Sequence, residues 1–141
     1  MKYLFDTNIV SELYKYRNGK INPSVANWLQ GVMPSETAVS CITLSEIKTG
    51  ILLKALKDPK QAEYLSLWFN NEMLPAFENR VLIVDSHVAL LAAEYHIPNK
   101  MDLNDAYIAA TAKVNHLTLV TRNVKDFTDC GIRLFNPFET E

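Results

Sequence analysis

Tyr3-Leu4-Phe5-Asp6-Thr7-Asn8 is a short apolar run that ends at an acid and is followed by two polar residues. Such a run is typical of a buried β-strand. Further apolar runs follow, and the segments between them have helical spacing. Strands are predicted at 3–5, 39–44, 81–84, 117–121 and 132–135, and helices at 8–16, from 23, 45–57, 59–73, 86–96 and 103–116. This alternation predicts an α/β fold with a mainly parallel sheet of four or five strands and helices on both faces.

Length and composition point to one domain spanning residues 1–141. The chain is 48% hydrophobic and 21% charged, which excludes disorder, collagen and coiled coil as descriptions of the whole sequence. No stretch approaches 18 apolar residues, so no membrane span is expected. Two cysteines are too few for a disulfide scaffold, and we expect reduced thiols in a cytoplasmic protein. A net charge of −2 means that any nucleic-acid binding must rest on a local site.

Several common catalytic motifs are missing. The four glycines form no phosphate-binding loop, neither the dinucleotide fingerprint nor the P-loop is present, and no G-x-S-x-G marks a serine hydrolase. His87, His96 and His116 lack metal-ligand spacing and are interpreted as surface or helix-end residues.

Acidic side chains are instead expected to gather at one edge of the sheet, because ligands of open parallel sheets bind beyond the carboxyl ends of the strands. Asp6 ends the first strand, Glu46 follows the second and Asp85 follows the third. Each also has a purely structural interpretation. Asp6 and Asp85 could cap the helices that follow, the preferred interpretation for Asp85, and Glu46 could complete a capping box that begins at Thr43.

Asp105 is the most informative acid. It lies in a predicted helix on the same stripe as Ile108, Ala109 and Ala112, and a carboxylate on an inward face is costly unless it is paired or binds a metal. The alternative is a first-turn acid favoured by the helix dipole, with Asp102 as the cap. Taken together, three converging carboxylates would repel one another unless a divalent cation neutralised them.

Four segments, in this order, resemble a PIN domain and, more narrowly, the VapC/FitB-type toxins of prokaryotic type II toxin–antitoxin pairs: 3–8, 45–46, 104–112 and 119–127. The resemblance implies a three-layer α/β fold and a metal-dependent endoribonuclease. Such a toxin hydrolyses RNA and inhibits translation or growth unless its cognate antitoxin binds it.

The resemblance also implies roles for individual residues. Asp6, Glu46 and Asp105 match the three core acidic positions, which are catalytic and hold Mg²⁺ or Mn²⁺. Asn123 stands where a fourth acid is common, so it is expected to reach a metal only through water. Hydrogen bonds that orient the metal ligands are expected from Thr7, Asn8 and Thr121. Asp126 is expected to have a structural or supporting role beside the site, and the alternative that it replaces Asn123 as the fourth site residue stays open. Arg122 and Lys48, with Lys54 and Lys100, are candidate RNA contacts.

Two partner surfaces and two other functions stay open. The apolar excess on helix 59–73, together with Trp28-Leu29, predicts either a homodimer face or an antitoxin groove. Asn123 in place of an acid allows a catalytically silent PIN-like module that acts through a protein partner. An Asp at the end of the first strand also occurs in haloacid-dehalogenase-like and receiver-like phosphate enzymes, although Asn8 departs from the Asp-x-Asp of the former.

Overall fold

The computed structural model describes residues 1–139 and is built on a five-stranded sheet in which every paired strand is parallel. The strand order is β3-β2-β1-β4-β5, with β1 at Tyr3–Phe5, β2 at Thr37–Ser40, β3 at Val81–Leu82, β4 at Thr118–Val120 and β5 at Leu134–Phe135. Residues 140–141, which the predicted domain includes, lie outside the described part.

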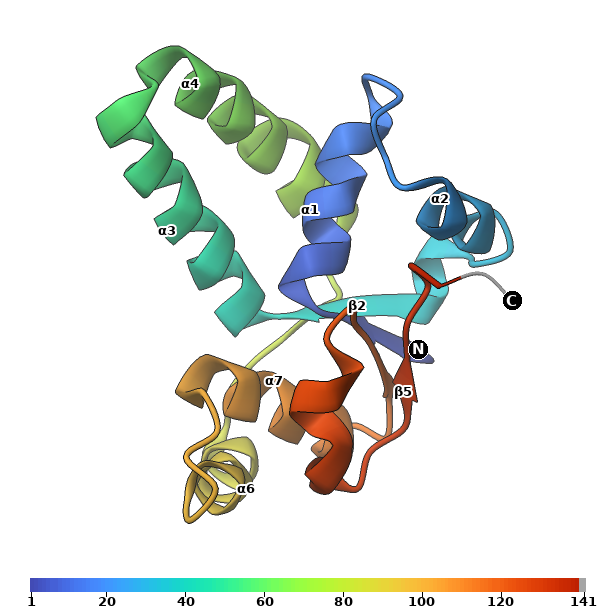
Figure 1. Ribbon diagram of the computed structural model, residues 1–141, viewed down its shortest axis with the longest axis vertical. Coiled ribbons are helices and arrows are strands. Elements are labelled where there is room, and N and C mark those ends of the chain that lie inside the picture. The colour runs from blue at the N-terminus through green and yellow to red at the C-terminus, as the bar shows by residue number, and fades with distance from the viewer. Residues whose placement is uncertain (140–141) are drawn as a thin grey trace.

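Helices cover both faces of this sheet, as Figure 1 shows. The helices of the first half lie on one side, and they are α1 (Thr7–Tyr16), α2 (Pro23–Leu29), α3 (Cys41–Lys57) and α4 (Pro59–Trp68). A π-helical turn (Phe69–Met73) and the short α5 (Leu74–Ala76) follow α4, and a 3₁₀ turn (Pro34–Glu36) precedes β2. On the other side lie α6 (Ser86–His96), α7 (Leu103–Val114) and the 3₁₀ helix η3 (Val124–Cys130). The predicted three-layer α/β fold is confirmed.

The alternation of side chains along β1 explains the two cores. Leu4 and Phe5 are both buried and point to opposite faces. Phe5 joins a cluster with α1 and α4 that includes Trp68, and Leu4 joins a cluster with α7 that includes Ile108.

The order of the strands decides where a ligand can bind. β1 is central and pairs with β2 on one side and with β4 on the other. The strands that follow β1 are therefore added first on one side of it, as β2 and β3, and then on the other, as β4 and β5. The crevice beyond the carboxyl ends of strands at such a switch point is the usual ligand site of an open α/β sheet. Asp6 follows β1 directly and donates its backbone N–H to the carbonyl of Val120, the last residue of β4 (2.9 Å). The fold therefore places Asp6 at the switch point.

Some predicted boundaries are wrong, and the second strand matters most. It ends at Ser40 rather than at 44, and α3 begins at Cys41, because the Ser40 hydroxyl accepts the N–H of Ile42 (3.0 Å) and caps the helix. The predicted capping box at Thr43 and Glu46 therefore does not exist, and both side chains lie inside α3. The third strand is also shorter than predicted, since β3 pairs only with β2 at the edge of the sheet.

Three smaller sequence predictions, on a helix cap, an apolar face and the cysteines, can be compared with the structure. Asp85 caps α6 by accepting the N–H of Val88 (2.9 Å), as predicted. Trp28 packs against the core around Phe5, and its ring also lies beside Phe135. Less of its surface is therefore available to a protein partner than predicted. Cys41 and Cys130 are free thiols. None of the helices in residues 1–139 combines the length and the apolar character that a membrane span requires.

Candidate active site

Asp6 is the buried centre of the site. It caps α1, and its Oδ1 accepts the N–H of Thr7 (2.8 Å). Its Oδ2 accepts the hydroxyl of Thr121 (2.8 Å) and the amide of Asn8 (3.4 Å). Burial raises the pKa of Asp6, the bonds from Thr121 and Thr7 oppose this, and the charges of Glu46 and Asp126 raise the pKa further.

Glu46 reaches the same place from α3. Its Oε1 accepts the hydroxyl of Thr7 at 2.6 Å, a short charge-assisted hydrogen bond. Thr7 therefore contacts two carboxylates, one through its backbone N–H and the other through its hydroxyl. This links the start of α1 to the second turn of α3.

Asp105 comes from the first turn of α7 on the opposite side of the sheet. Asp102 caps this helix by accepting the N–H of Asn104 (3.2 Å), which places Asp105 in the first turn. Asp105 also lies on the same stripe as the buried Ile108 and Ala109, so the two sequence interpretations are compatible. The pKa of Asp105 rises from 3.8 to about 7, mainly through burial and then through the charges of Asp6, Asp102, Glu46 and Asp126. The charges of Glu46 and Asp126 thus raise the pKa of both Asp105 and Asp6.

The remaining predicted residues divide into two groups. Thr121 and Asn8 hydrogen-bond to Asp6, and the backbone N–H of Asn123 donates to the Thr121 hydroxyl (3.0 Å). The side chain of Asn123 is exposed, as is Asp126, although Asp126 is near enough to raise the pKa of both Asp6 and Asp105.

Of the four cations predicted as RNA contacts, Arg122 and Lys48 form no ion pair with the carboxylates within the described residues. The Arg122 guanidinium lies over the Phe138 ring (4.8 Å). Lys48 is exposed on α3, two residues beyond Glu46. In residues 1–139, no lysine, arginine or histidine forms an ion pair with Asp6, Glu46 or Asp105.

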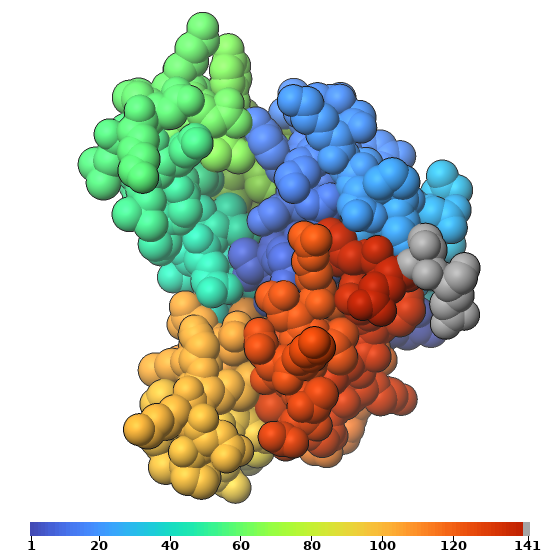
Figure 2. Space-filling view, in the orientation of Figure 1, coloured from blue at the N-terminus to red at the C-terminus, as the bar shows by residue number. Residues whose placement is uncertain are grey.

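Two hollows flank the carboxylates. The larger, about 670 Å³, runs between α1 and the α3–α4 hairpin, where Figure 2 shows a depression beside α1. It begins at Thr7 and Glu46 and continues past Lys54 to Trp68. The second hollow, about 420 Å³, contains one lysine among four acids: Lys100, Asp102, Asp105, Asp126 and Asp129.

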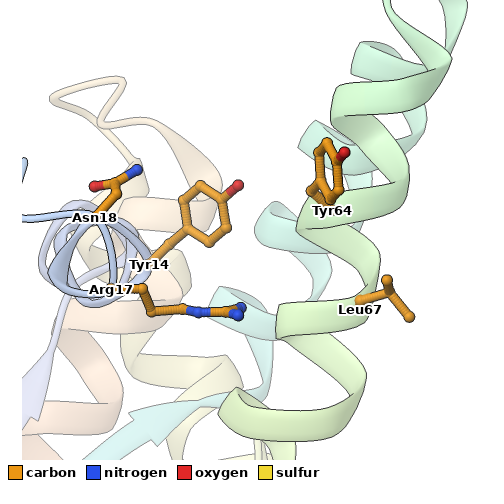
Figure 3. A pocket seen from close by; sticks show the side chains of 5 residues that line it. All are labelled: Tyr14, Arg17, Asn18, Tyr64 and Leu67. Atoms are coloured by element: carbon orange, nitrogen blue, oxygen red, sulfur yellow. The ribbon is translucent and has the colours of Figure 1, made fainter.

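The seam between α1 and α4 has a further hollow at its outer end (Figure 3), about 360 Å³ in volume. Tyr14 and Arg17 point from the α1 side towards α4, which contributes Tyr64 and Leu67. Arg17 is already paired with Glu72 (2.7 Å). Tyr14 lines this hollow and the larger one, so the two are neighbours along one seam.

The possible metal ligands of this site are carboxylate oxygen atoms, which hard divalent cations prefer. The carboxylates of Asp6, Glu46 and Asp105 supply oxygen atoms, and within residues 1–139 no ion pair offsets their negative charge. As the side chains of residues 1–139 stand, however, no three acidic, histidine or cysteine groups form a ready cage for a metal. A divalent cation need not be fully caged by protein groups, because an ion such as Mg²⁺ binds through one or two carboxylates and keeps several water ligands.

The sequence analysis gave Thr43 only a capping role and missed its place beside the site. It is fully buried in α3, and its hydroxyl lies 3.1 Å from that of Thr7. It stands three residues before Glu46, a spacing that puts both side chains on one face of a helix. The signal was present, but the predicted helix began too late for it to be used.

Comparison with known proteins gives a consistent set of relatives. The PIN domain family model matches residues 3–130. Toxin FitB of Neisseria gonorrhoeae is 32% identical over 140 residues, covering 96% of this chain and 97% of that protein. The VapC ribonuclease Y4jK of Sinorhizobium fredii is 30% identical, covering 96% and 97%.

Solved structures agree. The crystal structure of FitAcB from Neisseria gonorrhoeae superposes with a TM-score of 0.85 at 31% identity, covering 98% of this chain and 99% of that one. A toxin–antitoxin complex from Klebsiella pneumoniae has a TM-score of 0.71 at 28% identity, covering 99% and 100%.

Proposed function

The chain belongs to the PIN domain family, and we propose that it is the toxin of a type II toxin–antitoxin pair, a metal-dependent endoribonuclease that cleaves RNA and arrests translation or growth. We assign Mg²⁺ or Mn²⁺ to Asp6, Glu46 and Asp105, with Asn123 in contact through water. One observation supports the proposal: the charges of Asp6 and Glu46 raise the pKa of Asp105 across the sheet, and no cation of residues 1–139 is paired with any of the three.

A bound divalent ion supplies an activated water and offsets the charge that develops on the phosphate during hydrolysis. The chain contributes the orientation of its ligands. Thr7 and Thr121 fix both oxygens of Asp6, and Thr7 also holds Glu46, so neither carboxylate has to be reoriented when substrate arrives. Asp105, with a pKa of about 7, is partly protonated near neutral pH without a cation and is fully charged beside one.

RNA is proposed to reach these carboxylates along the larger hollow, because the other is lined by four aspartates that repel phosphate. Lys15 and Lys54 both line the larger hollow, but Lys15 is paired with Glu12, so Lys54 is the better placed cation for a phosphate there. Lys100 lines the acidic hollow beside Asp105. Arg122 and Lys48 remain weaker candidates, since neither lines either hollow.

A cognate antitoxin and a second copy of the chain are the proposed protein partners, and the cytoplasm is the proposed site of action. Apolar surface is available for both, since five large side chains on α3 and α4 are half exposed or more: Leu52, Leu53, Leu56, Tyr64 and Leu67. An antitoxin arginine reaching the carboxylates would replace the charge of the divalent ion.

The test is cleavage of total cellular RNA by the purified protein with Mg²⁺ or Mn²⁺, with the new RNA ends mapped by sequencing. Asp6→Asn, Glu46→Gln and Asp105→Asn should each abolish cleavage and growth inhibition while the protein stays folded. Asp85→Asn is the matched control, because Asp85 also follows a strand and caps a helix but lies outside the site.

Full activity in any folded member of the three variants would remove that residue from the site. Absence of Mn²⁺ binding at millimolar concentration, measured by calorimetry, would favour the catalytically silent binding module instead.

A further inference from the structure

Thr43 and Thr7 form a pair of hydroxyls behind Glu46. The Thr7 Oγ1 lies 2.6 Å from the Glu46 Oε1 and 3.1 Å from the Thr43 Oγ1. Thr43 is fully buried, so its hydroxyl has no access to solvent. The Thr7 oxygen is therefore shared between a carboxylate and a second hydroxyl.

The number of hydrogens fixes the direction of this chain. A hydroxyl carries one hydrogen and can accept through its lone pairs, whereas an ionised carboxylate only accepts. The 2.6 Å contact to Glu46 is the shorter and the charge-assisted one, so it takes the Thr7 hydrogen. The contact between the two threonines then requires that Thr43 donate to Thr7.

We infer that Thr43 is a positioning residue, which orients Glu46 through a directed chain from the Thr43 hydroxyl to the Thr7 hydroxyl to the Glu46 carboxylate. The inference rests on the metal site proposed above, because its consequence is the placing of a metal ligand. Hydrogen bonds in such a chain polarise one another, so the Thr43 donor strengthens the bond that Thr7 gives to Glu46. Thr7 also holds Asp6 through its N–H, so the chain reaches two of the three carboxylates.

Two substitutions separate positioning from packing. Thr43→Val keeps the shape and removes the donor, whereas Thr43→Ser keeps the donor and removes a buried methyl group. We expect Thr43→Val to weaken Mn²⁺ binding about tenfold, the low end for residues that orient metal ligands. Its unfolding temperature without metal should stay near wild type. Thr43→Ser should bind Mn²⁺ as wild type does and unfold roughly 2–4 °C lower.

Thr111→Val is the matched control, since Thr111 is equally buried but donates to the carbonyl of Tyr107 in its own helix (2.7 Å). It should leave Mn²⁺ affinity unchanged. Calorimetry gives the affinities, and circular dichroism gives the unfolding temperatures. Equal Mn²⁺ affinities for Thr43→Val and Thr43→Ser, or an equal loss in Thr111→Val, would overturn the inference.

A readout without metal keeps this test separate from the proposed function. In the metal-free protein, the side-chain scalar couplings of Glu46 in NMR should indicate one rotamer in wild type and in Thr43→Ser, and averaging in Thr43→Val. Failure of the wild type to bind Mn²⁺ or cleave RNA would count against the proposed function alone. Unchanged couplings in Thr43→Val would reject the positioning role even if cleavage is observed.

Discussion

Removing one charge from the carboxylate cluster should stabilise the protein when no metal is present. Asp105→Asn is the clearest perturbation, because Asp105 has the most strongly raised pKa, about 7 against the usual 3.8. A carboxyl group with a raised pKa favours the folded state while it is protonated. Its stabilising effect is therefore complete at low pH and is lost as the pH rises from about 4 through 7.

The size of the effect follows from the shift. At about 1.36 kcal/mol per pKa unit, a rise of roughly three units corresponds to an upper limit of about 4 kcal/mol. Asp105 is only half buried, so screening by water reduces this to about 1.5–2 kcal/mol. Loss of an acid from the first turn of α7 offsets about 0.5 kcal/mol through the helix dipole. The net gain for Asp105→Asn is thus about 1–1.5 kcal/mol at pH 8, or roughly 3–5 °C in unfolding temperature.

Thermal unfolding by circular dichroism between pH 4 and 8, in EDTA, measures this gain. The two proteins should unfold together near pH 4, and the variant should become progressively more stable up to pH 8. With Mn²⁺ at a hundred times its Kd the order should reverse, because binding stabilises the wild type by about 2.7 kcal/mol. Asp85→Asn should stay within about 0.5 kcal/mol of wild type throughout, since Asn caps a helix as well as Asp does. A variant less stable than wild type at pH 8 in EDTA would refute the reasoning.

Three further predictions concern residues around the site. Thr121→Val removes the donor to the Asp6 Oδ2, so it should raise the pKa of Asp6 further and lower the free energy of unfolding at pH 8 by about 1–3 kcal/mol, measured in urea. Ser40→Ala removes the cap of the helix that carries Glu46, so it should cost about 1 kcal/mol and lower kcat for RNA cleavage more than it changes KM. Glu12 has a lowered pKa because hydrogen bonds and nearby cations outweigh its burial, so Glu12→Gln should lower the unfolding temperature above pH 5 and lose this effect in acid; an unchanged difference down to pH 3 would contradict the assignment.

The order of strands and helices could be predicted from the sequence because it depends on patterns of neighbouring residues. The run at 3–5 and its terminal acid predicted a buried strand that presents Asp6 at the edge of the sheet, and the structure has this arrangement. The inward position of Asp105 followed from helical spacing alone. The metal-binding roles of these side chains stay predictions.

Other features depend on contacts between distant segments. Ser40 and Thr43 are both plausible helix caps, and the pairing of β2 with its neighbours, which runs to Ser40, decides for Ser40. The direction of the Arg122 side chain is set by the ring of Phe138, 16 residues later. No periodicity in either segment carries that information.

The central claim is that Asp6, Glu46 and Asp105 hold one divalent ion between them. Anomalous scattering from crystals soaked in Mn²⁺, recorded on both sides of the manganese absorption edge, tests it most directly. We expect a single strong peak among the three side chains, bound directly by one or two of them and through water by the rest, and no peak there in Asp6→Asn crystals. A manganese peak elsewhere, or a lysine or arginine nitrogen in its place, would contradict the account.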